Sequence, residues 1–248
     1  MVVYNKKRVL PVSLIIIWLT AIIAFSQSRE TGTKKEAITK TGEDLIAIDV
    51  LLEPDSTMIR KSKEVNSLLR RNVDSAKDFD ASHAHITLLQ SFVRKRDLDA
   101  VTAALSKVLV TERPMKLKMK TKGYGYDTWD GGAVTMIYIE RTRGLMRLHQ
   151  RTIQAIAPYA VSPGDAKAFT SPDIQPVSIN YVETFVPESS GDNYTPYIIS
   201  GVATKDSVKP IKAKSFAQFT FSAGGVAVYQ LGSFGIASKK LWSWTPKS

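Results

Sequence analysis

The sequence predicts an α+β fold with mainly antiparallel sheets, and three observations support this prediction. Apolar segments of strand length alternate with amphipathic segments of helical periodicity. Several strand-like segments are joined by glycine-containing turns, as in hairpins. The sequence lacks the glycine-rich phosphate loops that accompany nucleotide-binding parallel sheets. With 248 residues and 44% hydrophobic content, the chain is long enough to bury a large core.

The first half of the folded part is expected to contain three helices. Residues 44–54 form a continuous apolar run that ends at Pro54, which is typical of a buried strand. Asp55 or Ser56 can cap the helix that follows. The next expected elements are a strand at 82–90, a helix at 97–110, a strand at 114–122, a turn region at 123–132 leading to a hairpin partner at 131–140, and a helix at 143–157.

The second half is expected to consist mainly of strands, because its apolar segments are rich in β-branched and aromatic residues. The expected strands cover residues 176–187, 194–204, 214–222 and 224–232. Gly224 and Gly225 are expected to turn the last two into a hairpin. Trp242 and Trp244, in the tail, are expected to pack onto the core.

The N-terminal region is expected to stand outside the folded domain, which spans residues 44–248. Basic residues at 6–8 precede an apolar run at 9–25, so residues 1–26 have the pattern of a secretory signal peptide. An uncleaved membrane anchor through residues 9–25 is the alternative. Residues 27–43 predict a flexible linker. The protein is therefore expected to be exported, either periplasmic or secreted, or held at the membrane by this segment alone.

The amino-acid composition excludes several kinds of functional site and suggests one kind of partner. The chain has no cysteine, which excludes disulfides, cysteine nucleophiles and thiolate metal sites. Its formal net charge is +11, which fits a partner that carries phosphates or another anionic polymer, although solubility alone could also account for it.

Two of the three histidines stand two positions apart in the strand expected at 82–90. Because alternate side chains of a strand share a face, His83, His85 and Thr87 would project together. Three interpretations follow: one edge of an active site, a zinc-binding pair that needs a third ligand, or an ordinary strand. The remaining histidine, His149, falls on the apolar face of a predicted helix, where a core histidine bonded to a carbonyl is expected.

The stretch His85-Ile86-Thr87-Leu88, with the basic segment and helix after it, resembles the first signature of the two-histidine phosphoesterase superfamily. This group includes 2′-5′ RNA ligase-like proteins and cyclic phosphodiesterases. The order of predicted elements over residues 45–242 is also similar to that of the family. The resemblance implies a bilobal fold in which two antiparallel sheets with flanking helices surround a central cleft. It further implies chemistry without metal or cofactor, in which a His-x-Thr motif from each lobe moves protons and holds the phosphate.

The second signature is incomplete in this chain. In the segment "TPYIISG", Pro196 and Gly201 match the family's pattern Pro-His-x-Thr-x-Gly, but Tyr197 stands in the histidine place and Ile199 in the threonine place. A phenol titrates at about pH 10, so it is poorly suited to proton transfer near neutrality. The resemblance therefore implies a half-conserved site that binds a nucleotide, a cyclic phosphate or an RNA end, with weak or altered phosphoesterase activity. The alternative is a catalytically inactive structural or interaction protein that keeps only the scaffold.

Basic and aromatic residues beside the expected cleft are further candidates. Lysines at 116, 118, 120 and 122 alternate with apolar residues and would share one strand face, where they could follow a nucleic-acid backbone. A solvated edge strand protected by lysines is the competing interpretation. The candidate site residues are, for catalysis, His85, Thr87 and Tyr197, and, for phosphate or substrate binding, Lys118, Lys120 and Tyr126. No metal ligand is assigned.

Overall fold

A computed structural model of the chain describes residues 44–70, 84–129, 132–171, 173–208, 211 and 215–246. The expected signal peptide or anchor, the expected linker and His83 lie outside the described residues. Within these ranges, no helix combines the length and the apolar character needed to cross a bilayer.

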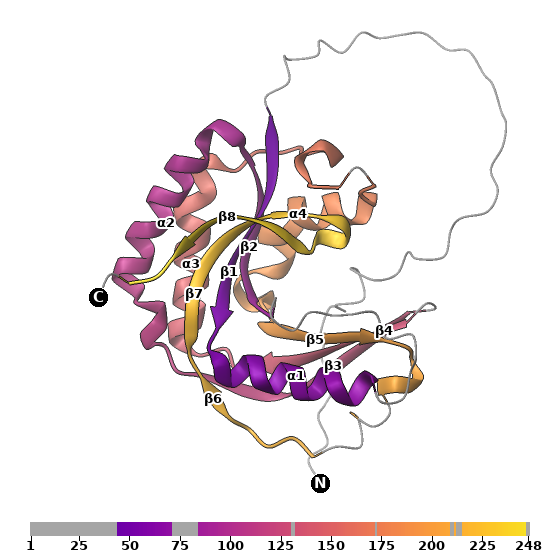
Figure 1. The fold of residues 1–248 in the computed structure, drawn as a ribbon. Helices are drawn as coiled ribbons and strands as arrows, with labels where there is room; N and C mark the ends of the chain where they lie inside the picture. Colours follow the sequence, from indigo (N-terminus) through magenta and orange to yellow (C-terminus); the bar gives the residue numbers. More distant parts are fainter. Residues whose placement is uncertain are drawn as a thin grey trace, which may run out of the picture.

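Two four-stranded antiparallel sheets form the framework of the fold, and four α-helices accompany them in the described part of the chain (Figure 1). The strand order is β2-β1-β7-β8 in the first sheet and β5-β4-β3-β6 in the second. In the first half the elements are β1 (Leu45–Pro54), α1 (Ser56–Arg70), β2 (Ile86–Arg94), α2 (Leu98–Glu112), β3 (Met119–Trp129), β4 (Gly132–Ile139) and α3 (Arg143–Ile156). In the second half they are α4 (Pro176–Ser189), β5 (Tyr197–Ala203), β6 (Thr220–Phe221), β7 (Ala223–Leu231) and β8 (Ala237–Trp244). The α+β prediction is therefore confirmed.

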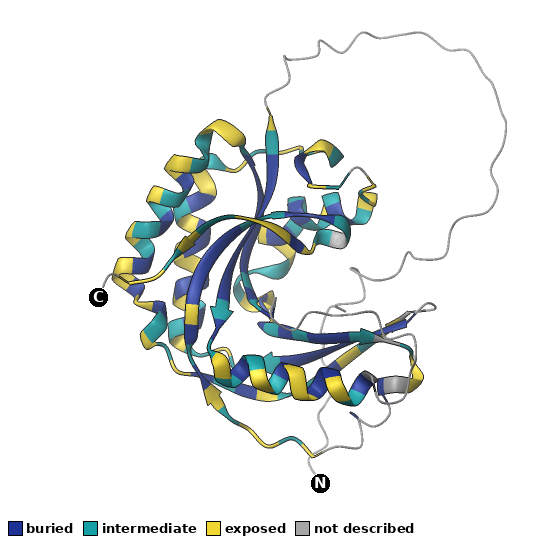
Figure 2. Cartoon of the chain, in the orientation of Figure 1, coloured by how far each residue is buried: buried dark blue, intermediate teal, exposed yellow. Residues whose placement is uncertain are grey.

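The central strand β1 divides its side chains between the two faces of the first sheet. Ile46, Ile48, Val50 and Leu52 point into the main core, where they join apolar side chains of α2 and α3. The alternate residue Ala47 belongs to a smaller cluster on the other face, which includes residues of α4. Figure 2 shows the result, with buried strands at the centre and exposed outer faces on the helices. Trp242 and Trp244 of β8 pack against the main core, as predicted.

Helix α1 connects the two sheets, and Asp55 starts it. One carboxyl oxygen of Asp55 accepts hydrogen bonds from the backbone N–H groups of Thr57 and Met58, at 3.0 and 3.2 Å. The other accepts the N–H of Ser222, at 2.8 Å, which ties the helix start to the segment between β6 and β7. The helix packs across β5 at Gly201, where a Cβ atom would lie 2.5 Å from Leu69, so only glycine allows this close approach.

One predicted strand is wrong: residues 176–187 belong to helix α4. Its β-branched and aromatic composition favoured a strand, but the buried positions Ser178, Val182 and Phe185 recur every three to four residues, which is a helical spacing. Pro176 occupies the first turn, where its missing N–H costs no hydrogen bond. Packing of this apolar stripe against β2 decides the outcome over local propensity.

The expected strand at 114–122 and turn region at 123–132 also need correction. Pro114–Lys116 forms a 3₁₀ turn, and β3 begins only at Met119 and continues to Trp129. The pairing of β3 with β4 shifts by one residue between Thr121 and Gly123. Up to this bulge the predicted alternation holds, because Met119 and Thr121 are buried whereas Lys118 is exposed and Lys120 is half-buried.

The last expected hairpin differs as well. Of the described residues 215–222, only Thr220–Phe221 forms a strand, and it pairs with β3. Gly224 and Gly225 lie within β7, which pairs with β1 and β8 instead. Strand pairing between distant parts of the chain carries no local sequence signal, so the apolar pattern located β7 but not its partners.

Candidate functional site

The predicted motif His85-x-Thr87 lies at the entrance of β2, next to a buried carboxyl group on β1. His85 directly precedes the strand, which begins at Ile86. The Thr87 hydroxyl donates a hydrogen bond to Oδ2 of Asp49, at 3.0 Å. Nε2 of His85 lies 3.7 Å from the same oxygen. The structure thus joins the imidazole and the hydroxyl of the motif through one carboxyl group.

A β-bulge adds a third polar side chain to this group. In the pairing of β1 with β2, Val50 faces Leu89 and Leu51 faces Thr87, so Leu88 is an extra residue on β2. The bulge brings Gln90 to the same face as Thr87, opposite Asp49. Nε2 of Gln90 donates to Oδ2 of Asp49, at 3.2 Å.

Asp49 is held in an unfavourable environment for a charge. It is only 1% exposed, and its Oδ1 has no hydrogen-bond partner among the described residues. Oε1 of Gln90 is likewise buried without a partner in this part of the chain. Burial raises the pKa of Asp49, and the nearby His85, Gln90 and Thr87 offset this effect only in part. A buried carboxyl with one unpaired oxygen is costly to keep, which points to a role other than stability.

Tyrosines of the second sheet and of α4 lie close enough to Asp49 for its charge to affect them. Tyr197 opens β5 and packs edge-on against Tyr138, with ring centroids 6.4 Å apart. Burial raises the pKa of Tyr197, and the charges of Tyr181, Tyr138 and Asp49 add to this effect. Burial also raises the pKa of Tyr181 to about 12. Near neutrality these phenols are therefore uncharged hydrogen-bond donors, not proton-transfer groups.

Two further side chains hold the backbone of the motif. The Tyr194 hydroxyl donates to the carbonyl of Thr87 at 2.8 Å, and Nδ1 of His149 lies 2.7 Å from the carbonyl of Leu88. The two rings are stacked 3.7 Å apart and nearly parallel, at 5°. Since a carbonyl only accepts, Nδ1 of His149 carries the proton. The prediction of a core histidine bonded to a carbonyl is confirmed, and Tyr194 couples the segment before β5 to the motif on β2.

The structure places the candidate binding residues elsewhere. Nζ of Lys118 donates to the Ser222 hydroxyl at 3.1 Å, and Nζ of Lys120 pairs with Glu140 at 3.2 Å. Tyr126 pairs with Thr135 on the face of the second sheet that α1 covers, opposite the face of Tyr138 and Tyr197. None of these three side chains therefore contributes to the group around Asp49.

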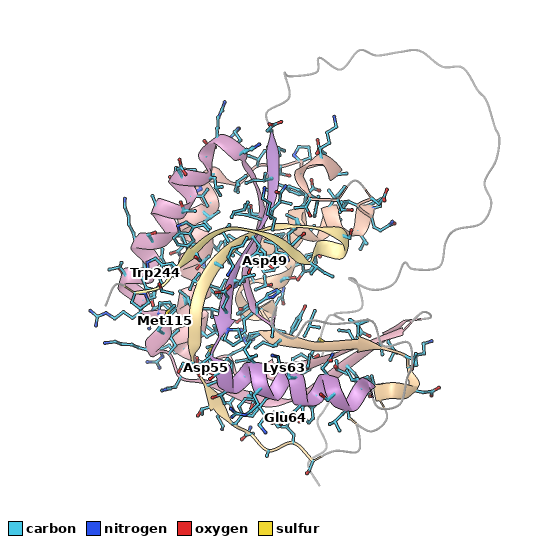
Figure 3. All side chains as sticks on the ribbon, in the orientation of Figure 1. Asp49, Asp55, Lys63, Glu64, Met115 and Trp244 are labelled. Carbon is cyan, nitrogen blue, oxygen red and sulfur yellow. The ribbon has the colours of Figure 1, made fainter. Side chains whose placement is uncertain are left out.

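The described residues form no metal centre, and one cavity adjoins the group around Asp49. No group of three His, Cys, Asp or Glu residues there could hold a metal ion, and His83 lies outside it. A cavity of about 300 Å³ lies on the outer side of β2, between the end of α3 and α4, and Gln90 contributes to its lining. Figure 3 shows Asp49 among the side chains at the centre of the first sheet.

Sequence reasoning missed Asp49, Gln90 and Tyr181. One charged residue in the middle of the apolar run "LIAIDVLLEP" was a usable signal for Asp49. The role of Gln90 could not be predicted from the sequence, because in a strand without a bulge its side chain would point to the face opposite Thr87. Tyr181 was missed because residues 176–187 were wrongly predicted to form a strand.

Comparisons with known proteins agree with the sequence resemblance. Residues 58–198, more than half of the chain, match the family model of the 2′-5′ RNA ligase superfamily. No curated protein matches the sequence. Among solved structures, TT0787 of Thermus thermophilus aligns with a TM-score of 0.46 and 16% identity over 80% of this chain and 97% of its own. E. coli LigT aligns in its apo form with a TM-score of 0.41 and 10% identity, over 81% of this chain and 97% of LigT. E. coli LigT in complex with 3′-AMP aligns with a TM-score of 0.40 and 12% identity, with the same coverage.

The family match begins in α1 and ends at the start of β5, so it includes the complete motif at His85 and, of the altered motif, Pro196 and Tyr197 but not Ile199. The chain therefore belongs to the 2′-5′ RNA ligase superfamily of two-histidine phosphoesterases.

Proposed function

We propose that this protein binds the phosphate of a nucleotide, a cyclic phosphate or an RNA end through His85 and Thr87, and that it cleaves phosphodiesters slowly. The observation that supports this most is the placement of both side chains against the buried carboxyl of Asp49. A buried carboxyl beside a histidine and a threonine orients both side chains, which suits groups that meet an anion or take part in proton transfer.

The chemistry available on the other side of the site is weaker. Tyr197 offers a neutral hydroxyl, because burial keeps its pKa above the ordinary value for tyrosine. It can donate a hydrogen bond to a phosphate oxygen, but it cannot take a proton near neutrality. Ile199 offers no polar group at all. Loss of one positioned acid or base costs about a hundred- to ten-thousandfold in rate, so binding is the better-supported activity.

Calorimetric titration with adenosine 2′- and 3′-phosphates tests the binding. We expect heat of binding for the intact protein and a large loss of affinity for His85→Ala and Thr87→Val. Thr128→Val is the matched control, because Thr128 is a threonine of β3 outside the group around Asp49. Absence of binding by the intact protein would contradict the proposal and favour the role of an inactive scaffold.

A further inference from the structure

We infer that Asp49 takes up a proton when the site binds a phosphate, and that this proton sets the direction of the Thr87 hydroxyl. This inference deepens the proposed function and rests on it. It identifies Asp49 as a positioning residue that acts through Thr87, not as a group that touches the ligand.

The argument starts from the hydrogen-bond capacity of one hydroxyl group. A threonine hydroxyl has a single hydrogen to donate and two lone pairs that accept. With Asp49 ionised, that hydrogen is committed to Oδ2 of Asp49, at 3.0 Å. Only lone pairs of Thr87 then remain for a ligand. A phosphodiester oxygen is also an acceptor, so the two oxygens would repel each other instead of bonding.

Protonation of Asp49 reverses this direction. A proton on Oδ2 can be donated to the Thr87 hydroxyl oxygen across the same 3.0 Å contact, and the Thr87 hydrogen becomes available to the phosphate. A proton on Oδ1 would find no acceptor among the described residues, so Oδ2 is the favoured position. One anion and one proton from solvent enter the site; the proton forms an O–H bond at Oδ2 of Asp49, and no other covalent bond forms or breaks.

Electrostatics point the same way. An ionised Asp49, itself almost fully buried, would place a second negative charge close to the bound phosphate. Burial already raises the pKa of Asp49 before any ligand arrives. The titratable groups that face Asp49 from the elements packed around it are His85 before β2, Tyr181 of α4, Tyr194 and Tyr197 at β5, and Tyr229 of β7, with Glu53 further along β1.

Among these groups, His85 is the rival position for the proton, because an imidazole nitrogen can also bind one. In that case an ionised Asp49 would help to keep His85 charged, and removing the charge of Asp49 would weaken phosphate binding. If Asp49 itself takes the proton, removing its charge strengthens binding. The two cases therefore differ in the sign of one mutational effect.

The test is calorimetric titration with sulfate and with dimethyl phosphate, whose charges stay constant between about pH 5 and pH 8, in buffers of different ionisation enthalpy. For the intact protein we expect uptake of a proton and an affinity that falls by up to about tenfold per pH unit above the pKa of Asp49. Asp49→Asn should bind more tightly than the intact protein at pH 7 and lose this pH dependence, because the amide carries no charge and its N–H group, placed at the position of Oδ2, can donate toward Thr87. Glu53→Gln is the matched control, since Glu53 is the next carboxyl along β1 and pairs with Lys240 instead.

Thermal unfolding of Asp49→Asn and titration of Thr87→Val test the inference independently. Asp49→Asn should unfold at a higher temperature than the intact protein at pH 7, since the raised pKa of Asp49 means that its ionisation costs stability. Thr87→Val should lose both affinity and proton uptake. Weaker binding by Asp49→Asn at pH 7, or unchanged proton uptake in Thr87→Val, would overturn the inference. A wild-type affinity that does not vary with pH would overturn it alone, whereas no binding by any variant would overturn the proposed function with it.

Discussion

Restoring the second motif is the sharpest test of how this site differs from a complete one. The double substitution Tyr197→His and Ile199→Thr would place a second His-x-Thr motif at the start of β5. Both positions stand on the strand that already faces the group around Asp49, and Tyr197 is electrostatically coupled to that carboxyl. We expect the double variant to cleave 2′,3′-cyclic AMP much faster than the wild-type protein.

The size of the gain follows from the protonation state of Tyr197. Burial raises its pKa above the ordinary value, so at pH 7 fewer than about one molecule in a thousand carries the phenolate that could accept a proton. A histidine with an ordinary pKa is mostly in its basic form at this pH. The gain in available base is thus about a thousandfold or more, which lies within the hundred- to ten-thousandfold expected for one positioned acid or base.

The assay is hydrolysis of 2′,3′-cyclic AMP at several pH values, with thermal unfolding as the check on folding. Tyr197→Phe serves as the opposite change, because it removes the phenol oxygen and leaves the ring packed against Tyr138. Tyr159→Phe is the matched control, at a partly buried tyrosine after α3. A double variant that folds and binds 3′-AMP but cleaves no faster than the wild type would refute the reasoning. So would rapid cleavage by the wild-type protein.

Three further predictions concern the surroundings of the motif. Tyr194→Phe leaves the Thr87 carbonyl without its phenol donor, so the free energy of unfolding in urea should fall by about 1–3 kcal/mol and phosphate binding should weaken; unchanged stability would contradict this role of Tyr194. Burial lowers the pKa of His149, so the contribution of His149 to the free energy of unfolding should be complete above about pH 6.5 and fall as the pH drops below that value. His149→Phe should remove that fall, and an unchanged pH profile would contradict this assignment. In Gly125→Ala, the new Cβ would lie 2.2 Å from the Tyr138 ring, so the ring must move. The free energy of unfolding should therefore fall by about 1–3 kcal/mol. Equal stability would contradict this and would show that β3 adapts.

The sequence alone was sufficient for the fold class and for one half of the site. The apolar runs and helical stripes located β1, α1, α2, α3 and β5, because burial imposes a spacing on local sequence that can be read directly. The pair His85 and Thr87 was identified by a resemblance that the family match now supports. The loss of the second motif at Tyr197 was equally visible, since it depends only on which residue stands there.

Tertiary structure decided what surrounds that pair. Asp49 lies 38 positions before Thr87 in the sequence, and only the antiparallel pairing of β1 with β2 brings their side chains together. The bulge at Leu88 then decides that Gln90 joins them, through a one-residue shift that the amino-acid pattern does not reveal. Tyr181 reaches the group because residues 176–187 pack as a helix despite their strand-like composition. Strand pairing, register and packing are interactions between distant residues, so their energies, and the chemistry that depends on them, are not encoded in any short stretch of sequence.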